Sequence, residues 1–171
     1  MNVKIDWKSH YVIPFKSTTD TSLRSFQYKF LTQILPTNKD LHNYKYKPSS
    51  LCDFCSSYVE TIEHLFWECR YVQIIWNELI AFLNTKNINI TINLIDVCLG
   101  TFKGGVDNIT VNYIIILMKH YIFRTKQTNN IPAFNSFINH LNSRIKVEQE
   151  IALLKDRSEL HNRKWIKFTN L

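Results

Sequence analysis

Glycine and proline are both scarce in this chain. Its 171 residues include only three glycines and four prolines. This composition excludes collagen-like and low-complexity chains, and it leaves long stretches without a helix breaker. Charged residues make up 20% of the chain and hydrophobic residues 45%, so the chain can bury a core. We therefore predict a folded, mostly α-helical protein.

Long apolar runs are also missing. The residues after Met1 include no apolar stretch of the kind that a secretory signal peptide needs. The most apolar segment, 109–123, is interrupted by Asn112, Lys119 and His120 and is shorter than the roughly 20 residues that a bilayer requires. We expect no membrane association and an intracellular location, in the nucleus or the cytoplasm, and no secretion.

Several enzyme classes are excluded by motifs that the sequence lacks. Two of the three glycines are adjacent, so no P-loop or dinucleotide-binding fingerprint can be formed. A zinc deaminase needs His-x-Glu ahead of Pro-Cys-x-x-Cys, whereas the closely spaced cysteine pair comes first here. Cys98 lies between Val97 and Leu99, which is typical of a buried structural thiol rather than a nucleophile. We expect no enzymatic activity.

Acidic residues are outnumbered, and the charge is unevenly distributed. The formal net charge is +7. Residues 1–50 carry a net +5, residues 51–100 carry −4 and residues 101–171 carry +6. A basic surface attracts polyanions, so the two basic flanks indicate nucleic acid as a partner. The alternative interpretation is that these charges are ordinary solvated helix faces.

The cysteines and one histidine have the spacing of a metal site. Cys52, Cys55, His64 and Cys69 form the pattern C-x2-C-x8-H-x4-C. Three thiolates and one imidazole complete the tetrahedral coordination of Zn²⁺, which leaves no position for a substrate, so we predict a structural zinc knuckle. The alternatives are a chance spacing, or a ligand set in which Cys98, His42 or His10 replaces one of the four.

The residues around this pattern carry a specific resemblance. Residues 51–55 read Leu-Cys-Asp-Phe-Cys, residues 60–69 read Glu-Thr-Ile-Glu-His-Leu-Phe-Trp-Glu-Cys, and Trp76 follows. This region resembles the zinc-binding region near the carboxyl end of reverse transcriptases from non-LTR (LINE-type) retrotransposons, which has a cysteine pair, then Glu-Thr-x-x-His-Leu-Phe-x-x-Cys and a tryptophan. Residues 5–7, 26–28, 34–38 and 119–126 also resemble elements of that family.

The resemblance implies an accessory domain that follows a polymerase and holds element RNA or target DNA. The polymerase portion is then a possible protein partner. No two aspartates are adjacent in this chain, so the Tyr-x-Asp-Asp signature of the polymerase is absent. We therefore expect a carboxyl-terminal piece, a decayed copy or an independent product of that region, which does not polymerise by itself.

Four regions are expected along the chain. Residues 1–19 are interpreted as an extended arm, and residues 20–83 as a helix followed by the zinc knuckle. Residues 84–108 form an irregular linker, in which the alternation of Ile88, Ile90 and Ile92 is consistent with a short strand or an exposed loop. Residues 109–171 form a carboxyl-terminal helical region. Residues 20–171 are expected to fold as one small helical domain organised around the Cys3His knuckle.

Nucleic-acid contacts are expected along the basic flanks. The candidates for binding phosphate are Lys45, Lys47, Arg124, Lys126, Arg163 and Lys164. The aromatic candidates for stacking on unpaired bases are Tyr44, Tyr46 and Trp165. The acidic residues expected to repel phosphate are Glu60, Glu63, Glu68 and Glu78. The alternative function is a zinc-stabilised protein-interaction module that docks on a polymerase or another subunit.

Overall fold

Helices account for the regular structure of the described residues, as the sequence predicts. The structure is a computed structural model that describes residues 6–101 and 108–168. Its helices are α1 (Trp7–Ser17), α2 (Thr21–Leu31), α3 (Asn38–Asn43), α4 (Arg70–Thr85), α5 (Leu94–Leu99), α6 (Asn108–Gln127), α7 (Phe134–Leu154) and α8 (Ser158–Trp165). A π-helical turn, η1 (His64–Glu68), precedes α4, and a short 3-10 turn, η3 (Ile166–Phe168), follows α8.

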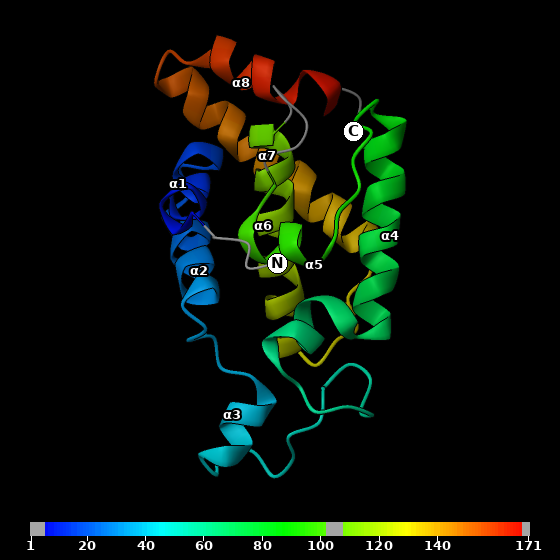
Figure 1. The fold of residues 1–171 in the computed structure, drawn as a ribbon. Helices are drawn as coiled ribbons and strands as arrows, with labels where there is room; N and C mark the ends of the chain where they lie inside the picture. Colours follow the sequence, from blue (N-terminus) through cyan, green and yellow to red (C-terminus); the bar gives the residue numbers. More distant parts are fainter. Residues whose placement is uncertain (1–5, 102–107, 169–171) are drawn as a thin grey trace.

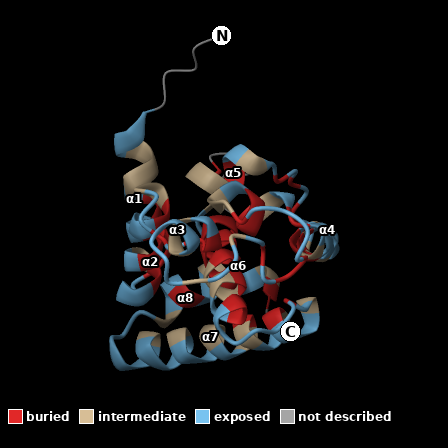
Figure 2. Cartoon of the chain, turned by 90° about the horizontal axis from the view of Figure 1, so that it is seen from below, coloured by how far each residue is buried: buried red, intermediate tan, exposed pale blue. Residues whose placement is uncertain are grey.

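Helix α6 lies at the centre of the molecule (Figure 1). Its side chains are buried around most of its circumference, which explains why this segment is the most apolar in the sequence. Helices α1 and α2 pack along α6, and α7 contacts both α6 and α4. Figure 2 shows buried residues concentrated around α6, whereas the outer face of α7 is exposed. We call this assembly of α1, α2 and α4–α8 the helical body.

A less regular region lies below the helical body in Figure 1. It consists of α3, the loops that carry the first two cysteines, and η1. We call residues 37–69 the zinc end. Its strand-like pairing within the described residues is a single antiparallel bridge between Leu51 and Val59.

The prediction of an extended arm over residues 1–19 is wrong where the structure describes it. Trp7–Ser17 is helical despite Pro14 in its interior. Ile13 and Pro14 are buried, and α1 packs against α6, so tertiary packing outweighs the local helix-breaking tendency of proline. Gly100 permits this contact, since a Cβ atom there would lie 2.7 Å from Cδ1 of Ile13. Its φ of 82° also favours glycine.

The region 84–108 is also more ordered than an irregular linker with a possible strand. Ile88, Ile90 and Ile92 are buried but belong to no strand in the described structure. Their alternation reflects an extended segment with one face on the core and no neighbouring strand to pair with. Helix α5 follows, and Asn93 and Asp96 form a capping box at its start. Residues 102–107 of this region lie outside the described residues.

Candidate metal centre

The structure brings the four predicted ligands together at the zinc end. The ligand atoms of Cys52, Cys55, His64 and Cys69 all lie within 4.8 Å of one another, and all four residues are buried. No other group of three or more metal-ligating side chains occurs among the described residues. The alternative ligand sets that include Cys98, His42 or His10 are therefore not supported.

The geometry fits a tetrahedral zinc ion. Zinc–ligand bonds of about 2.3 Å to sulfur and 2.0–2.1 Å to nitrogen imply tetrahedral edges of about 3.8 Å between two sulfurs and about 3.6 Å between sulfur and nitrogen. The Sγ atoms of Cys52 and Cys69 are 3.9 Å apart, and Sγ of Cys55 is 3.3 Å from Nε2 of His64. The residues present thus match the ion in both type and spacing.

A cation would favour the thiolate form of the sulfurs. The contact with Cys69 and burial raise the pKa of the Cys52 thiol, so the sulfurs by themselves disfavour a second thiolate. A coordinating Zn²⁺ deprotonates its thiols outright and neutralises the buried charge. The ion would stabilise the fold, because four protein ligands leave no position for an activated water.

A tight turn positions the first two ligands. The Ser56 amide donates to the carbonyl of Cys52 at 2.8 Å, and the Cys52 amide donates to the carbonyl of Tyr58 at 2.9 Å. Ser56 takes a φ of 53° at the tip of this turn. The two hydrogen bonds fold the Cys-x-x-Cys segment back on itself, so that both sulfurs face the same point.

The π-helical turn η1 positions the other two ligands, His64 at its start and Cys69 directly after its end. The amide of Cys69 donates to the carbonyl of His64 at 2.9 Å, which is the i to i+5 pairing of a π-helix. Such turns are rare and are found mostly at functional sites. Thr61 begins this segment, because its Oγ1 accepts a hydrogen bond from the His64 amide at 3.1 Å. The wide turn thereby places both ligands on the side that faces the cysteine pair.

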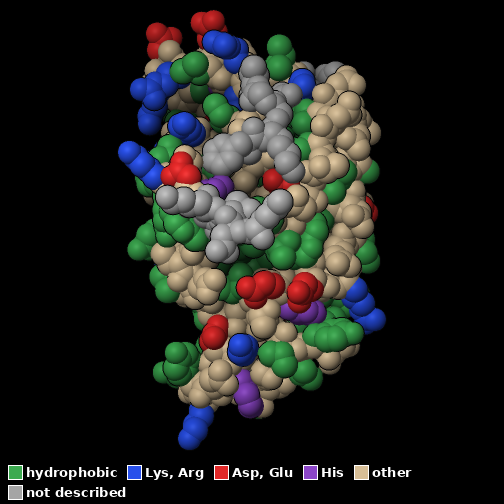
Figure 3. All heavy atoms as spheres, viewed as in Figure 1, with side chains coloured by type: hydrophobic (Ala, Val, Ile, Leu, Met, Phe, Trp, Pro, Cys, Tyr) green, Lys and Arg blue, Asp and Glu red, His purple; other side chains and the backbone are tan. Residues whose placement is uncertain are grey.

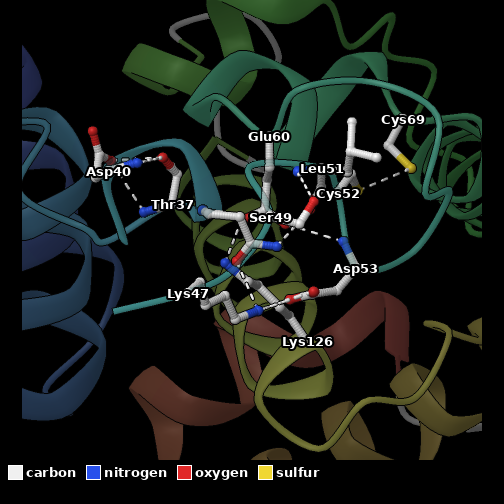
Figure 4. Close-up of polar contacts among 11 residues, drawn as sticks. Thr37, Asp40, Lys47, Ser49, Leu51, Cys52, Asp53, Glu60, Cys69 and Lys126 are labelled. Carbon is white, nitrogen blue, oxygen red and sulfur yellow. Dashed lines mark hydrogen bonds and ion pairs between the residues drawn. The ribbon is translucent and has the colours of Figure 1, made fainter. Parts of the chain in front are cut away.

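A buried ion pair supports the zinc end from the helical body. Glu60 is fully buried and pairs through Oε1 with Nζ of Lys126, at the end of α6. The same oxygen accepts a hydrogen bond from the amide of Asn38 at 2.8 Å, and Oε2 accepts one from the Asp53 amide. Figure 4 shows Glu60 reaching between the cysteine loop and Lys126. One carboxylate thus connects α3, the cysteine loop and α6.

A second polar cluster fixes the cysteine loop to α3. Nζ of Lys47 donates to both carboxylate oxygens of Asp53, at 2.8 and 2.9 Å, and to Oδ1 of Asn38 at 2.9 Å (Figure 4). Nδ2 of Asn38 donates to the carbonyl of Leu51 at 2.7 Å. These hydrogen bonds fix the cysteine loop to α3 both before Cys52, at Leu51, and after it, at Asp53.

The remaining residues of the Glu-Thr-x-x-His-Leu-Phe-x-x-Cys segment connect the zinc end to the core. Leu65 and Phe66 are fully buried. The ring of Phe66 contacts Phe30 of α2 edge to face, at 5.0 Å between ring centroids. Trp76 of α4 is buried and donates from its ring nitrogen to the carbonyl of Phe66 at 2.8 Å. Leu65, Phe66 and Trp76 therefore pack the segment that carries the ligands against the core.

The comparison with known families matches this geometry. Residues 2–76 match the family described as zinc-binding in reverse transcriptase. This zinc-binding reverse-transcriptase region includes all four ligands and ends at Trp76. The resemblance inferred from the sequence is confirmed for these residues, and the buried Cys3His group is assigned as their structural zinc site. No match to a curated protein is found for the chain.

The residues predicted to contact nucleic acid differ in their exposure to solvent. Lys45, Arg124 and Arg163 are exposed. Lys47 is half-buried in its pair with Asp53.

Lys126 and Lys164 lie beside helix ends, as predicted, but their amines are paired with carboxylates and not open to solvent as expected. Lys126 is buried against Glu60. Lys164 pairs with Glu148 at 2.7 Å, and its ammonium lies 4.9 Å from the centre of the Trp165 ring. Both amines already have protein partners, so a phosphate would have to displace Glu60 or Glu148 to bind them.

Two further expectations about exposure are corrected. Trp165 is buried and donates to Glu148 at 2.7 Å, so it does not stack on bases. Glu60 does not belong to an acidic surface, whereas Glu63, Glu68 and Glu78 are exposed.

Cys98 is half-buried, and burial raises the pKa of its thiol, which agrees with a structural role. The described helices include none that is both long and apolar enough to span a bilayer.

Sequence reasoning missed one buried cation in the helical body. Lys119 is fully buried in α6 and donates to Oε1 of Gln27 and to the carbonyl of Val97, both at 2.7 Å. Its ammonium lies 4.1 Å from the centre of the Phe30 ring. The signal in the sequence is a lone lysine in the most apolar segment, which was interpreted only as an interruption.

Proposed function

We propose that this chain is a nucleic-acid-binding accessory domain of a non-LTR retrotransposon reverse transcriptase, without a catalytic centre of its own. It would hold element RNA or target DNA while the polymerase portion acts. The family match supports a zinc-binding region of a reverse transcriptase. The observation that carries the proposal is a set of three consecutive exposed side chains, Tyr44, Lys45 and Tyr46, which we call the aromatic turn.

The backbone of the aromatic turn is well defined. Lys45 follows the end of α3 with a φ of 63°. The Tyr46 amide donates to the carbonyl of Leu41 at 2.8 Å, and the Lys45 amide donates to the carbonyl of His42 at 2.9 Å. This is the Schellman pattern, in which a residue in the left-handed conformation ends a helix. Backbone hydrogen bonds therefore fix the conformation of the turn, and its side chains are not needed to hold it.

The side chains of the turn suit a nucleic-acid strand. Tyr44 is 72% exposed and Tyr46 is 80% exposed, so both rings are accessible to an approaching base. Figure 3 shows basic, histidine and hydrophobic side chains mixed at this lower end of the molecule. Aromatic rings stack on unpaired bases at about 1–3 kcal/mol per base, while a lysine between them neutralises phosphate.

The test is a binding titration of the zinc-loaded chain with single-stranded RNA, single-stranded DNA and a primer-template at two salt concentrations. Replacing both tyrosines of the aromatic turn with alanine should weaken binding by about tenfold or more. Lys45→Gln should reduce the slope of log K against log salt by about one. Tyr28→Ala and Lys29→Gln are matched controls, because both residues are exposed on α2.

Equal affinity of the aromatic-turn variants and the parent would contradict the proposal. Zinc content, measured in parallel, must stay unchanged, since none of the substituted side chains contacts a ligand.

A second candidate function is docking on another protein through the end of α7 and α8. Ile151, Leu153 and Leu154 of α7 and Leu160 of α8 are exposed, as is Phe15 of α1. An apolar surface of this kind responds weakly to salt, whereas phosphate contacts weaken steeply as salt rises. A partner retained at high salt, and lost on Leu154→Ser with Leu160→Ser, would favour this candidate.

A further inference from the structure

A polar cavity lies between α2, α6 and α7, and none of its lining residues is a zinc ligand. Its volume is about 510 Å³. The side chains that carry the argument are Ser22 of α2, His120, Arg124 and Thr125 of α6, and His140 and Arg144 of α7. Figures 1 and 2 show these three helices next to one another.

The same short pattern occurs on two of the helices. His120 and Arg124 are four residues apart on α6, and His140 and Arg144 are four residues apart on α7. Residues four apart lie on the same face of a helix. Each helix therefore presents one imidazole and one guanidinium to the space between them. The repeated His-x-x-x-Arg spacing is a sequence signal for this cavity.

The cavity has more positive than negative groups available. Arg124 is exposed, and it makes no ion pair or hydrogen bond with any residue that the structure describes. Nη1 of Arg144 pairs with Oδ2 of Asp20 at 2.8 Å. The other oxygen of Asp20 caps α2 by accepting from the Ser22 amide at 2.8 Å. This carboxylate is thus already committed, while the guanidinium of Arg144 retains further donors.

The two histidines of the cavity also lie in positively charged surroundings. Nδ1 of His120 is buried and has no hydrogen-bond partner among the described residues. Burial, then the charges of Arg144, His140 and Arg124, lower the pKa of His120 to about 4, against an opposing effect of Asp20. Burial and Arg144 also lower the pKa of His140. A bound anion would reverse these charge effects and give the ring nitrogens an acceptor.

We propose that this cavity binds one phosphate group of a nucleic-acid strand. Arg124 and Arg144 donate to its oxygens, since the planar fork of arginine suits phosphate, and the two histidines and the hydroxyls of Ser22 and Thr125 complete the shell. The nucleic-acid source rests on the proposed function, whereas the phosphate chemistry of the cavity does not depend on the aromatic turn. Apart from Ser22, the residues of the site lie outside residues 2–76.

The first experiment titrates the zinc-loaded chain with inorganic phosphate and follows the histidine ring signals by NMR. Saturable shifts are expected for His120 and His140 but not for His42. Arg124→Gln removes no protein contact, so the variant should fold normally and bind phosphate at least tenfold more weakly. Arg163→Gln, at an exposed position near the end of α8, is the matched control and should bind as the parent does.

A second experiment identifies the source of the phosphate. Single-stranded oligonucleotides with a 5′-phosphate or a 5′-hydroxyl distinguish a terminal phosphate from an internal phosphodiester, and Arg124→Gln should weaken binding in either case. If inorganic phosphate does not shift the ring signals of His120 and His140, or if Arg124→Gln and the parent bind phosphate with equal affinity, the proposed phosphate site is wrong. This holds even if the aromatic turn binds nucleic acid. Phosphate binding here without any oligonucleotide binding overturns the nucleic-acid source and the proposed function together.

Discussion

The zinc end and the helical body are stabilised by different means. In the helical body, aliphatic and aromatic side chains from α1, α2, α4, α6 and α7 bury one another around α6. In the zinc end, α3 has only six residues, and the loops around it are fixed by hydrogen bonds, ion pairs and four ligand atoms. A short polar segment cannot bury enough apolar surface to offset its conformational entropy. In this region a metal and a polar network add to the core contacts of Leu65 and Phe66.

The two regions also use buried charge differently. Glu60 in the zinc end is matched by a full opposite charge on Lys126. Lys119 in the helical body has only neutral acceptors, Gln27 and Val97, and an aromatic ring. A paired buried charge holds two segments together, whereas an unpaired one carries a desolvation cost. The predictions below test this contrast, starting with the largest effect.

Removing one ligand should separate the two regions. Cys55→Ser is expected to abolish stoichiometric zinc binding and to unfold residues 51–70, since structural zinc contributes about 10–16 kcal/mol in small zinc-finger peptides. The amides of α6 should stay protected, because α6 packs on α1, α2, α7 and α8, none of which carries a ligand. Zinc content by elemental analysis and amide hydrogen exchange measure the two effects.

Cys98→Ser is the matched control and should keep its zinc. Full zinc content in Cys55→Ser would show that the ligand assignment is wrong. Equal loss of protection in both regions would show that they unfold as one unit.

Neutralising Glu60 should have the next largest effect. Glu60→Gln leaves the ammonium of Lys126 buried without its counter-charge, which destabilises a protein by about 3–5 kcal/mol. The free energy of unfolding should fall by that amount in urea denaturation of the zinc-loaded chain. Glu63→Gln, at an exposed neighbouring position, should change it by less than about 0.5 kcal/mol. Equal values for the two variants would rule out the ion pair as a tie between the regions.

Lys119 should make the stability of the helical body depend on pH. Burial lowers its pKa from 10.5 to about 7 in the folded chain, while the unfolded chain keeps the ordinary value. Between these pH values the unfolded state binds more protons, so the free energy of unfolding rises with pH, by at most about 1.4 kcal/mol per unit. Lys119→Met should lose this slope.

Urea denaturation of parent and Lys119→Met at pH 7 and pH 9 measures the difference. Zinc binding also varies with pH but is common to both proteins, so it cancels in the comparison. Parallel pH dependences would contradict the depressed pKa.

The smallest effect is expected at Glu68. Its Oε2 lies 4.0 Å from Nδ1 of His64, on the opposite side of the ring from the nitrogen that faces Cys55. Carboxylates in this position orient the imidazole of a zinc ligand. Because the separation is long and Glu68 is exposed, Glu68→Gln should weaken zinc affinity by less than about tenfold in a chelator competition. Glu78→Gln on α4 is the control, and an equal change there would indicate a general charge effect.

Much of the helical body and all four zinc ligands could be predicted from the sequence. Asp20 caps α2 through two amides, and an aspartate just before an apolar periodic stretch is typical of such a cap. The ligand set was identifiable because metal coordination constrains residue type and spacing over a short segment. These features are local, so a single sequence contains the information.

The features that were missed depend on contacts between distant segments. The partner of Glu60 lies 66 residues away, and nothing near either residue indicates the pairing. Helix α1 was missed because its stability comes from packing on α6 rather than from its own sequence, which includes Pro14. The alternating isoleucines were misread because alternation records one buried face and not the presence of a neighbouring strand.

The ion pair between Glu60 and Lys126 also has an evolutionary consequence. Glu60 lies inside the matched region 2–76 and Lys126 lies 50 residues beyond its end. Loss of the amine leaves a buried carboxylate without its counter-charge, and loss of the carboxylate leaves a buried amine without one. A neutral substitution at either position therefore favours a compensating substitution at the other. In related chains the two positions should co-vary, and the zinc-binding region and α6 should be inherited together rather than exchanged as separate parts.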